Sequence, residues 1–235
     1  MPNSAAELAE QLLLAVRKGG SYNKLIDALY HITEEQLAHD LPAERLKRAF
    51  WLNLYNAFGQ ILLLAHPVDL RSPWPRLAHY TARRIQLAGQ RLSLNDLEHG
   101  MLRRSKLWWS KGYLSKCIPN GFEQRFRVPV DPRIHFALNC GAAGCPPIAF
   151  YEADKLDAQL DMATRSFLAD HVVYDPVADT VHVTALFNWY RGDFGGRSGV
   201  LRFLKRYDAI AMDVEPCIRY SPYDWSVSLQ NYSAQ

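Results

Sequence analysis

The segment "RIHFALNCGAAGCPPI", residues 133–148, gathers the side chains of the sequence best suited to chemistry. It holds His135, Asn139, Cys140 and Cys145 among glycines, and it ends near two prolines. A thiolate is a strong nucleophile, and a nearby imidazole or the N–H groups of a glycine turn can lower the pKa of a thiol from about 8.5 toward neutrality. Three interpretations compete: a cysteine nucleophile with its base, a metal site, or a structural turn that is rich in sulfur.

The two cysteines have different surroundings in the sequence. Alternating apolar residues predict a strand over 133–139 that breaks into a glycine turn at Cys140, which can expose that sulfur. Cys145 precedes Pro146, which favours an extended backbone and a buried or partnering sulfur. Strict alternation places His135 on the face opposite Cys140, so the nucleophile interpretation requires a bend at the end of the strand.

The metal interpretation is weaker on spacing. The two cysteines stand four residues apart, which is longer than the two-residue spacing of a zinc knuckle, and no second ligand pair follows. Remote ligands such as His135 with His99 or Glu98 would have to complete the site. The sequence therefore predicts no metal, and it contains no motif for another cofactor.

Length and composition predict one large domain. The chain has 235 residues, of which 49% are apolar and 12% aromatic, and its formal net charge is only +3. This charge gives no reason to expect binding to nucleic acid or to a membrane. A basic stretch from Arg103 to Lys111 contains Trp108 and Trp109 and could stack bases, but basic stretches more commonly form solvated surfaces.

The same sequence predicts a cytoplasmic location. The longest apolar run, Ile61 to Ala65, is far shorter than the roughly 20 residues of a membrane span. The first 20 residues run from acidic to basic, the reverse of a secretory signal. Of the four cysteines, Cys117 and Cys217 are isolated, so a disulfide framework is not expected and the thiols are predicted to be reduced.

Helical spacing of apolar residues dominates the first third of the chain. Residues 1–41 are predicted to be a helical N-terminal extension, with Ser21 and Thr33 as N-caps of its second and third helices. A long helix follows over 42–66 and is expected to be central. Residues 42–235 are predicted to form a single domain.

Strands and helices alternate irregularly after the long helix. Two hairpins are predicted, one over 83–96 around a glycine turn and one over 171–184. Further helices are expected over 156–167, after Thr184, and over 200–207. These elements predict an α+β fold in which the central helix packs on a mostly antiparallel sheet.

The long helix carries an unusual polar stripe. Asn53, Asn56 and Gln60 share one face among apolar neighbours, and burying them unpaired would cost about 1–3 kcal/mol each. We therefore expect them to face inward and to contact the cysteine turn. They could support that turn or donate to an oxyanion, or they could bond loop backbone inside the core.

Six motifs in order resemble the family known as domain of unknown function 547, over roughly residues 45 to 227. The motifs are "FWLNLYNAF" (50–58), "LSLNDLEHGMLR" (92–103), "DPRIHFALNCGAAGCPPI" (131–148), the helix over 151–168, "FNWYRGDFG" (187–195) and "YDWSV" (223–227). The resemblance implies a papain-like or transglutaminase-like cysteine-hydrolase relationship with permuted strand order. Plant relatives are described as interaction domains, and a shared fold does not by itself establish a reaction.

By these motifs the resemblance implies four functional positions, Glu98, His135, Cys140 and Asp193. A thiol hydrolase needs a nucleophile, a base and a group that orients the base, and Cys140, His135 and Glu98 fill these roles. Each position also has a structural explanation. His135 could be a satisfied histidine on a strand, Glu98 could complete a capping box with Asn95, and Asp193 could hold a glycine turn or orient a substrate.

Two functional hypotheses follow. The first is a cysteine-dependent acyl-transfer enzyme that acts on a peptide, an amide or a thiol-containing small molecule, with Cys140 as the nucleophile. The second is a non-catalytic module that binds a peptide or thiol ligand in the same cleft. In both, Asn53, Asn56, Cys145 and Asp193 are candidate binding residues, and the partner is a small molecule or a peptide.

The cysteine spacing generates a prediction about zinc. Because a second pair of ligands is missing, we expect the purified protein to carry no stoichiometric zinc and its thermal unfolding to be unchanged by a chelator. Elemental analysis and a melting curve check this. One zinc per chain, with unfolding on chelation, would contradict it.

Overall fold

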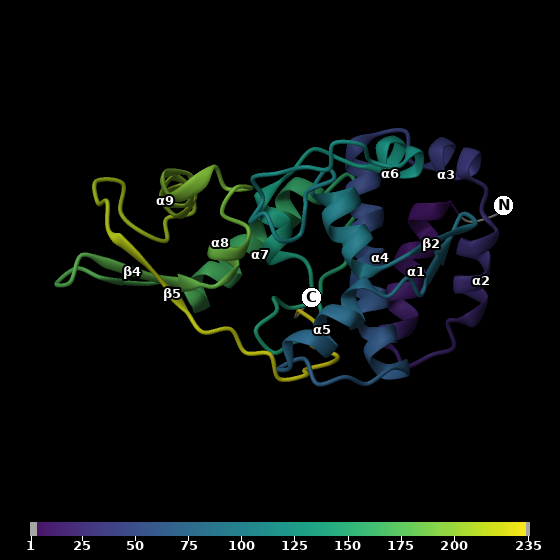
Figure 1. The fold of residues 1–235 in the computed structure, drawn as a ribbon, viewed down its shortest axis with the longest axis horizontal. Helices are drawn as coiled ribbons and strands as arrows, with labels where there is room; N and C mark the ends of the chain where they lie inside the picture. The colour runs from purple at the N-terminus through teal and green to yellow at the C-terminus, as the bar shows by residue number, and fades with distance from the viewer. Residues whose placement is uncertain (1–3, 234–235) are drawn as a thin grey trace.

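The predicted central helix is α4, Glu44–Ala65, and it is buried on all sides over most of its length. Every residue from Ala49 to Leu63 is buried. A helix that is enclosed all round lies inside a core. In the computed structural model, which describes residues 4–233, α4 runs through the half of the fold that contains the N-terminus (Figure 1). Within those residues, no helix is both long enough and apolar enough to cross a membrane.

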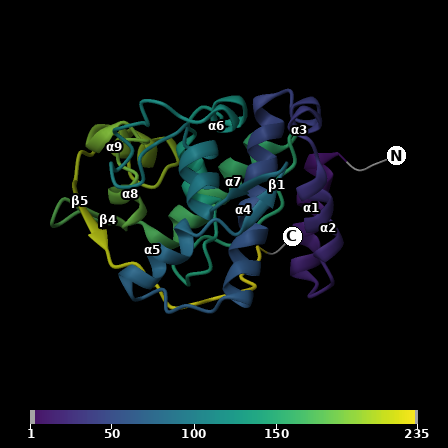
Figure 2. The same ribbon diagram turned by 45° about the vertical axis from the view of Figure 1, so that its right-hand side comes forward.

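Three helices precede α4: α1 (Ala5–Arg17), α2 (Asn23–His31) and α3 (Glu34–Asp40). Capping boxes begin α1 and α3, and the second of these is the predicted cap at Thr33. The predicted cap Ser21 lies one residue before the actual N-cap of α2, Tyr22, whose side chain makes no capping bond. Helix α1 lies along α4 (Figure 2).

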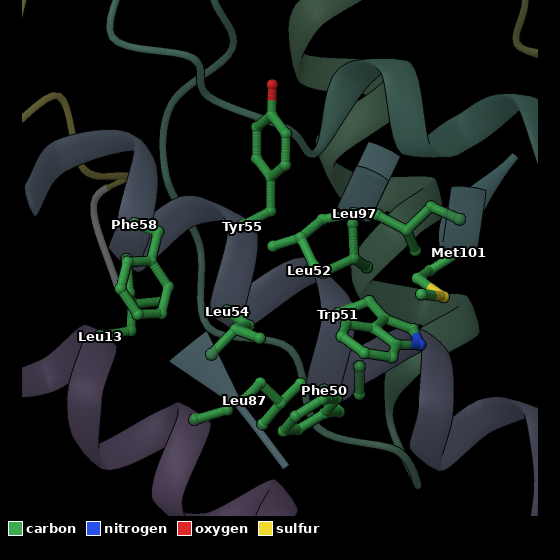
Figure 3. Close-up of a cluster of buried hydrophobic side chains, with 14 of the residues drawn as sticks. Leu13, Phe50, Trp51, Leu52, Leu54, Tyr55, Phe58, Leu87, Leu97 and Met101 are labelled. Carbon is green, nitrogen blue, oxygen red and sulfur yellow. The ribbon is translucent and has the colours of Figure 1, made fainter. Parts of the chain in front are cut away.

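Apolar side chains of these helices join the same buried cluster as α4. Figure 3 shows part of this cluster, including Leu13 from α1 and Phe50, Trp51 and Phe58 from α4. The predicted N-terminal extension therefore shares its core with the chain that follows. The remaining helices are α5 (Pro73–Thr81), η1 (Asp96–Leu102), α6 (Gly121–Phe126), η2 (Pro132–Phe136), α7 (Leu156–His171), α8 (Leu186–Trp189) and α9 (Gly196–Arg206).

The strands form two small sheets, and both predicted hairpins are confirmed. One sheet pairs β1 (Ile85–Leu87) with β2 (Gln90–Leu92), antiparallel across a turn at Ala88 and Gly89 where both residues have positive φ. The other pairs β3 (Val173–Asp175) antiparallel with β4 (Thr180–Thr184), and adds β5 (Cys217–Ser221) parallel to β4. The α+β class is therefore confirmed, with one parallel pair beside two antiparallel pairs.

A second core, rich in phenylalanine, packs the other half of the fold. The ring of Phe136 lies 5.4 to 6.1 Å from four other phenylalanine rings, which are Phe167, Phe187, Phe194 and Phe203. These rings come from η2, α7, α8, α9 and the loop before α9. Helices α8 and α9 lie beside β4 and β5 in this half (Figure 1).

The strand predicted over 133–139 was wrong. Residues Pro132–Phe136 form the 3₁₀ helix η2, whose N-cap Asp131 accepts a hydrogen bond from the N–H of Arg133. A proline at the first helical position after an aspartate cap favours a helix start. The segment from Ile134 to Asn139 is buried throughout, so its short apolar alternation does not mark one inner and one outer face.

The amide stripe of α4 faces inward, as predicted. Asn56 donates to the carbonyl of Ala137 at 3.0 Å and accepts from the N–H of Asn139 at 2.9 Å. Gln60 donates to the side-chain oxygen of Asn139 at 3.4 Å and accepts from the N–H of Gln230 at 2.8 Å. Both residues therefore hold the chain that leads into the cysteine turn.

Asn53 has a different partner. It exchanges two hydrogen bonds of 2.9 Å with the backbone of Tyr151, after the turn. Between Asn56 and Gln60 the helix comes unusually close to the start of the turn. A Cβ at Gly59 would stand only 2.7 Å from the carbonyl oxygen of Asn139. The stripe bonds backbone inside the core, which was one of the three expected uses.

Replacing Asn56 with leucine tests this support. The change leaves the N–H of Asn139 and the carbonyl of Ala137 without their partners, so we expect the free energy of unfolding to fall by about 2 kcal/mol or more. Leu64→Ala, at a position of α4 that is 53% exposed, is the control and should change it by less than about 0.5 kcal/mol. Urea unfolding measures both, and equal effects would contradict the role of the stripe.

Candidate active site

The cysteine turn brings its two sulfurs together. The Sγ atoms of Cys140 and Cys145 lie 2.9 Å apart, and the N–H of Cys140 donates to Sγ of Cys145 at 3.1 Å. Gly141 has a φ of +89°, which a residue with a Cβ rarely adopts. Its N–H donates to the side chain of Asn139 at 2.9 Å. Hydrogen bonds to Cys145 at its end and to Asn139 at its start thus close the turn.

The C-terminal segment and two tyrosines hold the turn from outside. The backbone N–H groups of Ala143 and Gly144 donate to the carbonyls of Ser226 and Asp224. The Tyr223 hydroxyl donates to Sγ of Cys145 at 3.1 Å. On the other side, the Tyr80 hydroxyl of α5 donates to the carbonyl of Cys140 at 3.2 Å.

These surroundings give the two thiols opposite properties. The hydrogen bond from Cys145 lowers the pKa of Cys140 to about 7, against the effect of burial, and Tyr80 adds to the lowering. Burial raises the pKa of Cys145, and the neighbouring Cys140 raises it further. Cys140 is therefore the thiolate of the pair near neutral pH.

His135 is clamped by a buried carboxylate. Its Nε2 lies 2.9 Å from Oδ2 of Asp193, and the same oxygen accepts from Nε of Arg103 at 2.6 Å. Burial alone would raise the pKa of Asp193, but the bonds from His135 and Arg103 lower it to about 2. Asp193 is therefore ionised at neutral pH, and Arg103 balances its charge.

The tautomer of His135 follows from this clamp. Burial lowers the pKa of His135 in spite of Asp193, so the imidazole is neutral at neutral pH. A neutral ring facing a carboxylate must donate from Nε2, which leaves Nδ1 as an acceptor. Nδ1 has no hydrogen-bond partner among residues 4–233. Within those residues His135 also makes no direct hydrogen bond to Cys140. The acceptor is thus available to a molecule in the adjacent pocket.

Glu98 occupies a different place from the one proposed for it. Its carboxylate accepts from the hydroxyls of Tyr190 at 2.7 Å and Tyr55 at 3.2 Å. Burial opposes ionisation, but His99 and Arg103 bring its pKa below the usual value. The group that bonds His135 is Asp193, whereas Glu98 bonds Tyr190, whose ring stacks on His135 at a centroid distance of 3.8 Å. The side chain of Asn95 makes no capping bond, so the capping box is not formed.

Glycines allow Asp193 to reach His135. Gly112 has a φ of +88°, and a Cβ there would collide with the carboxylate of Asp193. The N–H of Gly192 donates to the carbonyl of Lys111 at 2.7 Å, which joins the two loops. The loop contact at Gly192 therefore places the neighbouring Asp193 where its carboxylate can bond His135.

A cavity of about 540 Å³ opens beside these groups. His135, Cys140, Cys145 and Glu98 line it, whereas Asn53, Asn56 and Asp193 are not among the residues of its wall. Five of the six tryptophans also line it, namely Trp74, Trp108, Trp109, Trp189 and Trp225. Trp74, Trp108 and Trp109 are 79%, 50% and 58% exposed, which places apolar rings at the mouth. Such a cavity suits an apolar or aromatic ligand.

Several residues of the site were not identified from the sequence. Tyr190, Tyr223 and Trp225 lie in the motifs "FNWYRGDFG" and "YDWSV", so the motifs signalled them without giving a role. Arg103 likewise ends the motif "LSLNDLEHGMLR", whereas Tyr80 lies outside all six motifs. Within the described residues, no group of three or more His, Cys, Asp and Glu side chains is placed to hold a metal ion.

The chain belongs to a family of proteins of unknown function, domain of unknown function 547. The profile of this family matches residues 40–168, more than half of the chain. This segment includes α4, Glu98, His135 and both cysteines of the turn. No match was found among curated proteins, and none among solved structures.

The pKa difference generates a prediction about alkylation. Labelling by iodoacetamide follows the thiolate fraction, which rises as the pH passes the pKa, so labelling of Cys140 should rise with a midpoint near pH 7. Cys145 should lag because its pKa is raised. Since Cys145 supplies the main stabilisation, Cys145→Ala should move the midpoint for Cys140 upward.

The control is Cys217→Ala, which removes an exposed thiol far from the turn and should leave the midpoint unchanged. Mass spectrometry of the labelled peptides at a series of pH values makes the measurement. Earlier modification of Cys145, or a midpoint that Cys145→Ala does not move, would refute this account of the thiolate.

Proposed function

We propose that the protein is a cysteine-dependent acyl-transfer enzyme with Cys140 as nucleophile and His135 as general base. The observation that carries this proposal is the 2.9 Å hydrogen bond between Nε2 of His135 and Asp193. This bond makes Nε2 the donor and leaves Nδ1 as the proton acceptor, and both His135 and Cys140 line the same cavity. A nucleophile, a base and an oriented third group are the parts that acyl transfer through a thiol requires.

The proposed reaction has two halves. Sγ of Cys140 attacks the acyl carbon of the substrate as the thiolate. Near pH 7 part of Cys140 is still protonated, and its proton passes to Nδ1 of His135, directly or through a water. The leaving amine, alcohol or thiol takes this proton as its bond to the acyl carbon breaks, and a thioester remains. In the second half a water or another nucleophile attacks the thioester and gives its proton to His135. The C–S bond then breaks, the acyl product leaves, and the proton returns from His135 to Sγ of Cys140.

Asp193 takes the orienting role that the sequence motifs suggested for Glu98. It is bonded to His135, and it favours the imidazolium that forms when Nδ1 accepts a proton. Glu98 and Tyr190 position the opposite face of the imidazole through the ring stack. The direct bond missing between His135 and Cys140 is compatible with this chemistry, because catalytic bonds are commonly long before substrate binds.

The cavity walls support a substrate with an apolar or aromatic group next to its acyl carbon. Tryptophans at the mouth offer faces for such a group, and the polar side chains gather at the cysteine end. The papain-like or transglutaminase-like relationship with permuted strand order belongs to the same proposal. A small molecule or a peptide fits these walls.

An acyl-enzyme assay tests the proposal. With p-nitrophenyl acetate as probe, we expect a burst of p-nitrophenolate, an acetyl group on Cys140 detected by mass spectrometry, and slower turnover that Cys140→Ala abolishes. Asp193→Asn should reduce kcat by about 10²–10⁴-fold, because it deprives His135 of a charged acceptor. The control Asp213→Asn changes an exposed carboxylate and should leave kcat unchanged. Turnover by Cys140→Ala at the original rate would reject Cys140 as nucleophile.

One observation favours a second candidate, the non-catalytic binding module. Sγ of Cys140 is bonded to Cys145 and not to His135, and the tryptophan-lined cavity can hold a ligand without turnover. Quenching of tryptophan fluorescence by a peptide or thiol ligand, with no acyl-enzyme from any ester or thioester probe, would select this candidate over the enzyme.

A further inference from the structure

The two cysteines of the turn differ in their access to solvent. Both sulfurs line the cavity, but Cys140 is half-buried whereas Cys145 is only 5% exposed. The Tyr223 hydroxyl and the N–H of Cys140 both point at Sγ of Cys145, which fixes this sulfur in place. A small reagent that enters the cavity therefore meets Cys140 first.

The sulfurs are already close to bonding distance. They are 2.9 Å apart, so a disulfide of about 2.05 Å requires less than about 1 Å of movement. Four residues separate the two cysteines, and Gly141 and Gly144 stand at the two ends of this span. Gly141 already holds a positive φ. The turn can absorb this shift without disturbing the helices around it.

We propose that Cys140 and Cys145 form a thiol–disulfide redox pair, in which Cys140 reacts with a peroxide and Cys145 resolves the product. The proposal rests on the geometry of the turn, and it holds whether or not the protein transfers acyl groups. The thiolate character of Cys140 supports it, since peroxides react with thiolates.

The reaction balances with hydrogen peroxide as the oxidant. The thiolate of Cys140 attacks one peroxide oxygen, the O–O bond breaks, and Cys140 becomes a sulfenic acid while hydroxide leaves and takes up a proton. The thiol of Cys145 then attacks the sulfenic sulfur. The S–S bond forms, the S–O bond breaks, and the thiol proton leaves with the hydroxyl as water. Two thiols are oxidised and one peroxide is reduced, and a dithiol reductant reverses the change.

A disulfide here would change the cavity. It would remove the only thiolate that lines it, since Cys117 and Cys217 are exposed on other parts of the described chain. The oxidised protein is therefore inert toward electrophiles at this turn, and reduction restores the reactive thiol.

Thiol counting tests the pair without any assay of activity. After treatment with a small excess of hydrogen peroxide, the denatured wild-type protein should lose two thiols per chain. The peptide that spans 140–145 should lose two hydrogen masses, and dithiothreitol should reverse both changes. Cys145→Ser should instead stop at the sulfenic acid of Cys140, which dimedone traps. Cys140→Ser should lose no thiol under the same conditions.

The matched control is the double variant Cys117→Ser and Cys217→Ser, which keeps the turn and should still lose two thiols. Peptide mapping of the wild-type protein needs no variant at the turn, so the proposal is tested even if a turn variant fails to fold. Retention of all four thiols, or a disulfide that includes Cys117 or Cys217, would overturn the proposal. A disulfide between Cys140 and Cys145 in a protein that makes no acyl-enzyme would leave this inference standing and remove only the proposed function.

Discussion

The hydrogen bonds between α4 and residues 137–139 are the constraint on which the site depends. The side chain of Asn56 both donates to and accepts from the backbone of this segment, and the side chain of Gln60 donates to the side chain of Asn139. A helix buried on every side cannot shift without disturbing the whole core, so the segment bonded to it is fixed equally firmly. Gly59 allows the close approach that these bonds require. The cysteine turn begins where this fixed segment ends.

The 3₁₀ helix η2, directly before this segment, joins the two hydrophobic cores. Ile134 packs into the cluster around α4, whereas Phe136, two residues later, lies at the centre of the phenylalanine cluster. His135 stands between them with its ring against Tyr190 and its Nε2 on Asp193. A 3₁₀ helix makes this division, because it turns successive side chains in different directions about its axis. The cavity thus lies at the junction of the two halves, where binding sites commonly form.

The sequence predicted the elements better than the contacts between them. Apolar spacing located α4 and α7, and turn residues located both hairpins, because these signals are local. The error over 133–139 arose because residues 134–139 are all buried, so their alternation carried no information about faces. The amide stripe was predictable, since a polar group in an apolar helix must find a partner.

The clamp on His135 was beyond local reasoning. Asp193 lies 58 positions from His135 and is brought to it by the loop contact of Gly192 with Gly112. Glu98 stood in a recognisable motif, and nothing in its neighbours distinguished an acceptor for tyrosine hydroxyls from an acceptor for an imidazole. The motifs did name Asp193, but pairing it with its partner required the folded chain.

The family match ends at residue 168, and this boundary divides the site. The thiols and the imidazole lie inside it, while Asp193, Tyr190, Tyr223 and Trp225 all come from the chain beyond it. The C-terminal segment returns beneath the fold from β5 toward α5 to deliver the last two (Figure 1). The reactive thiols and imidazole therefore lie on one stretch of polypeptide, whereas the cavity wall is built from both, because Trp74, Trp108 and Trp109 precede residue 168. A change beyond residue 168 would therefore reshape one part of the cavity wall, and a change at Asp193 would reach the imidazole itself.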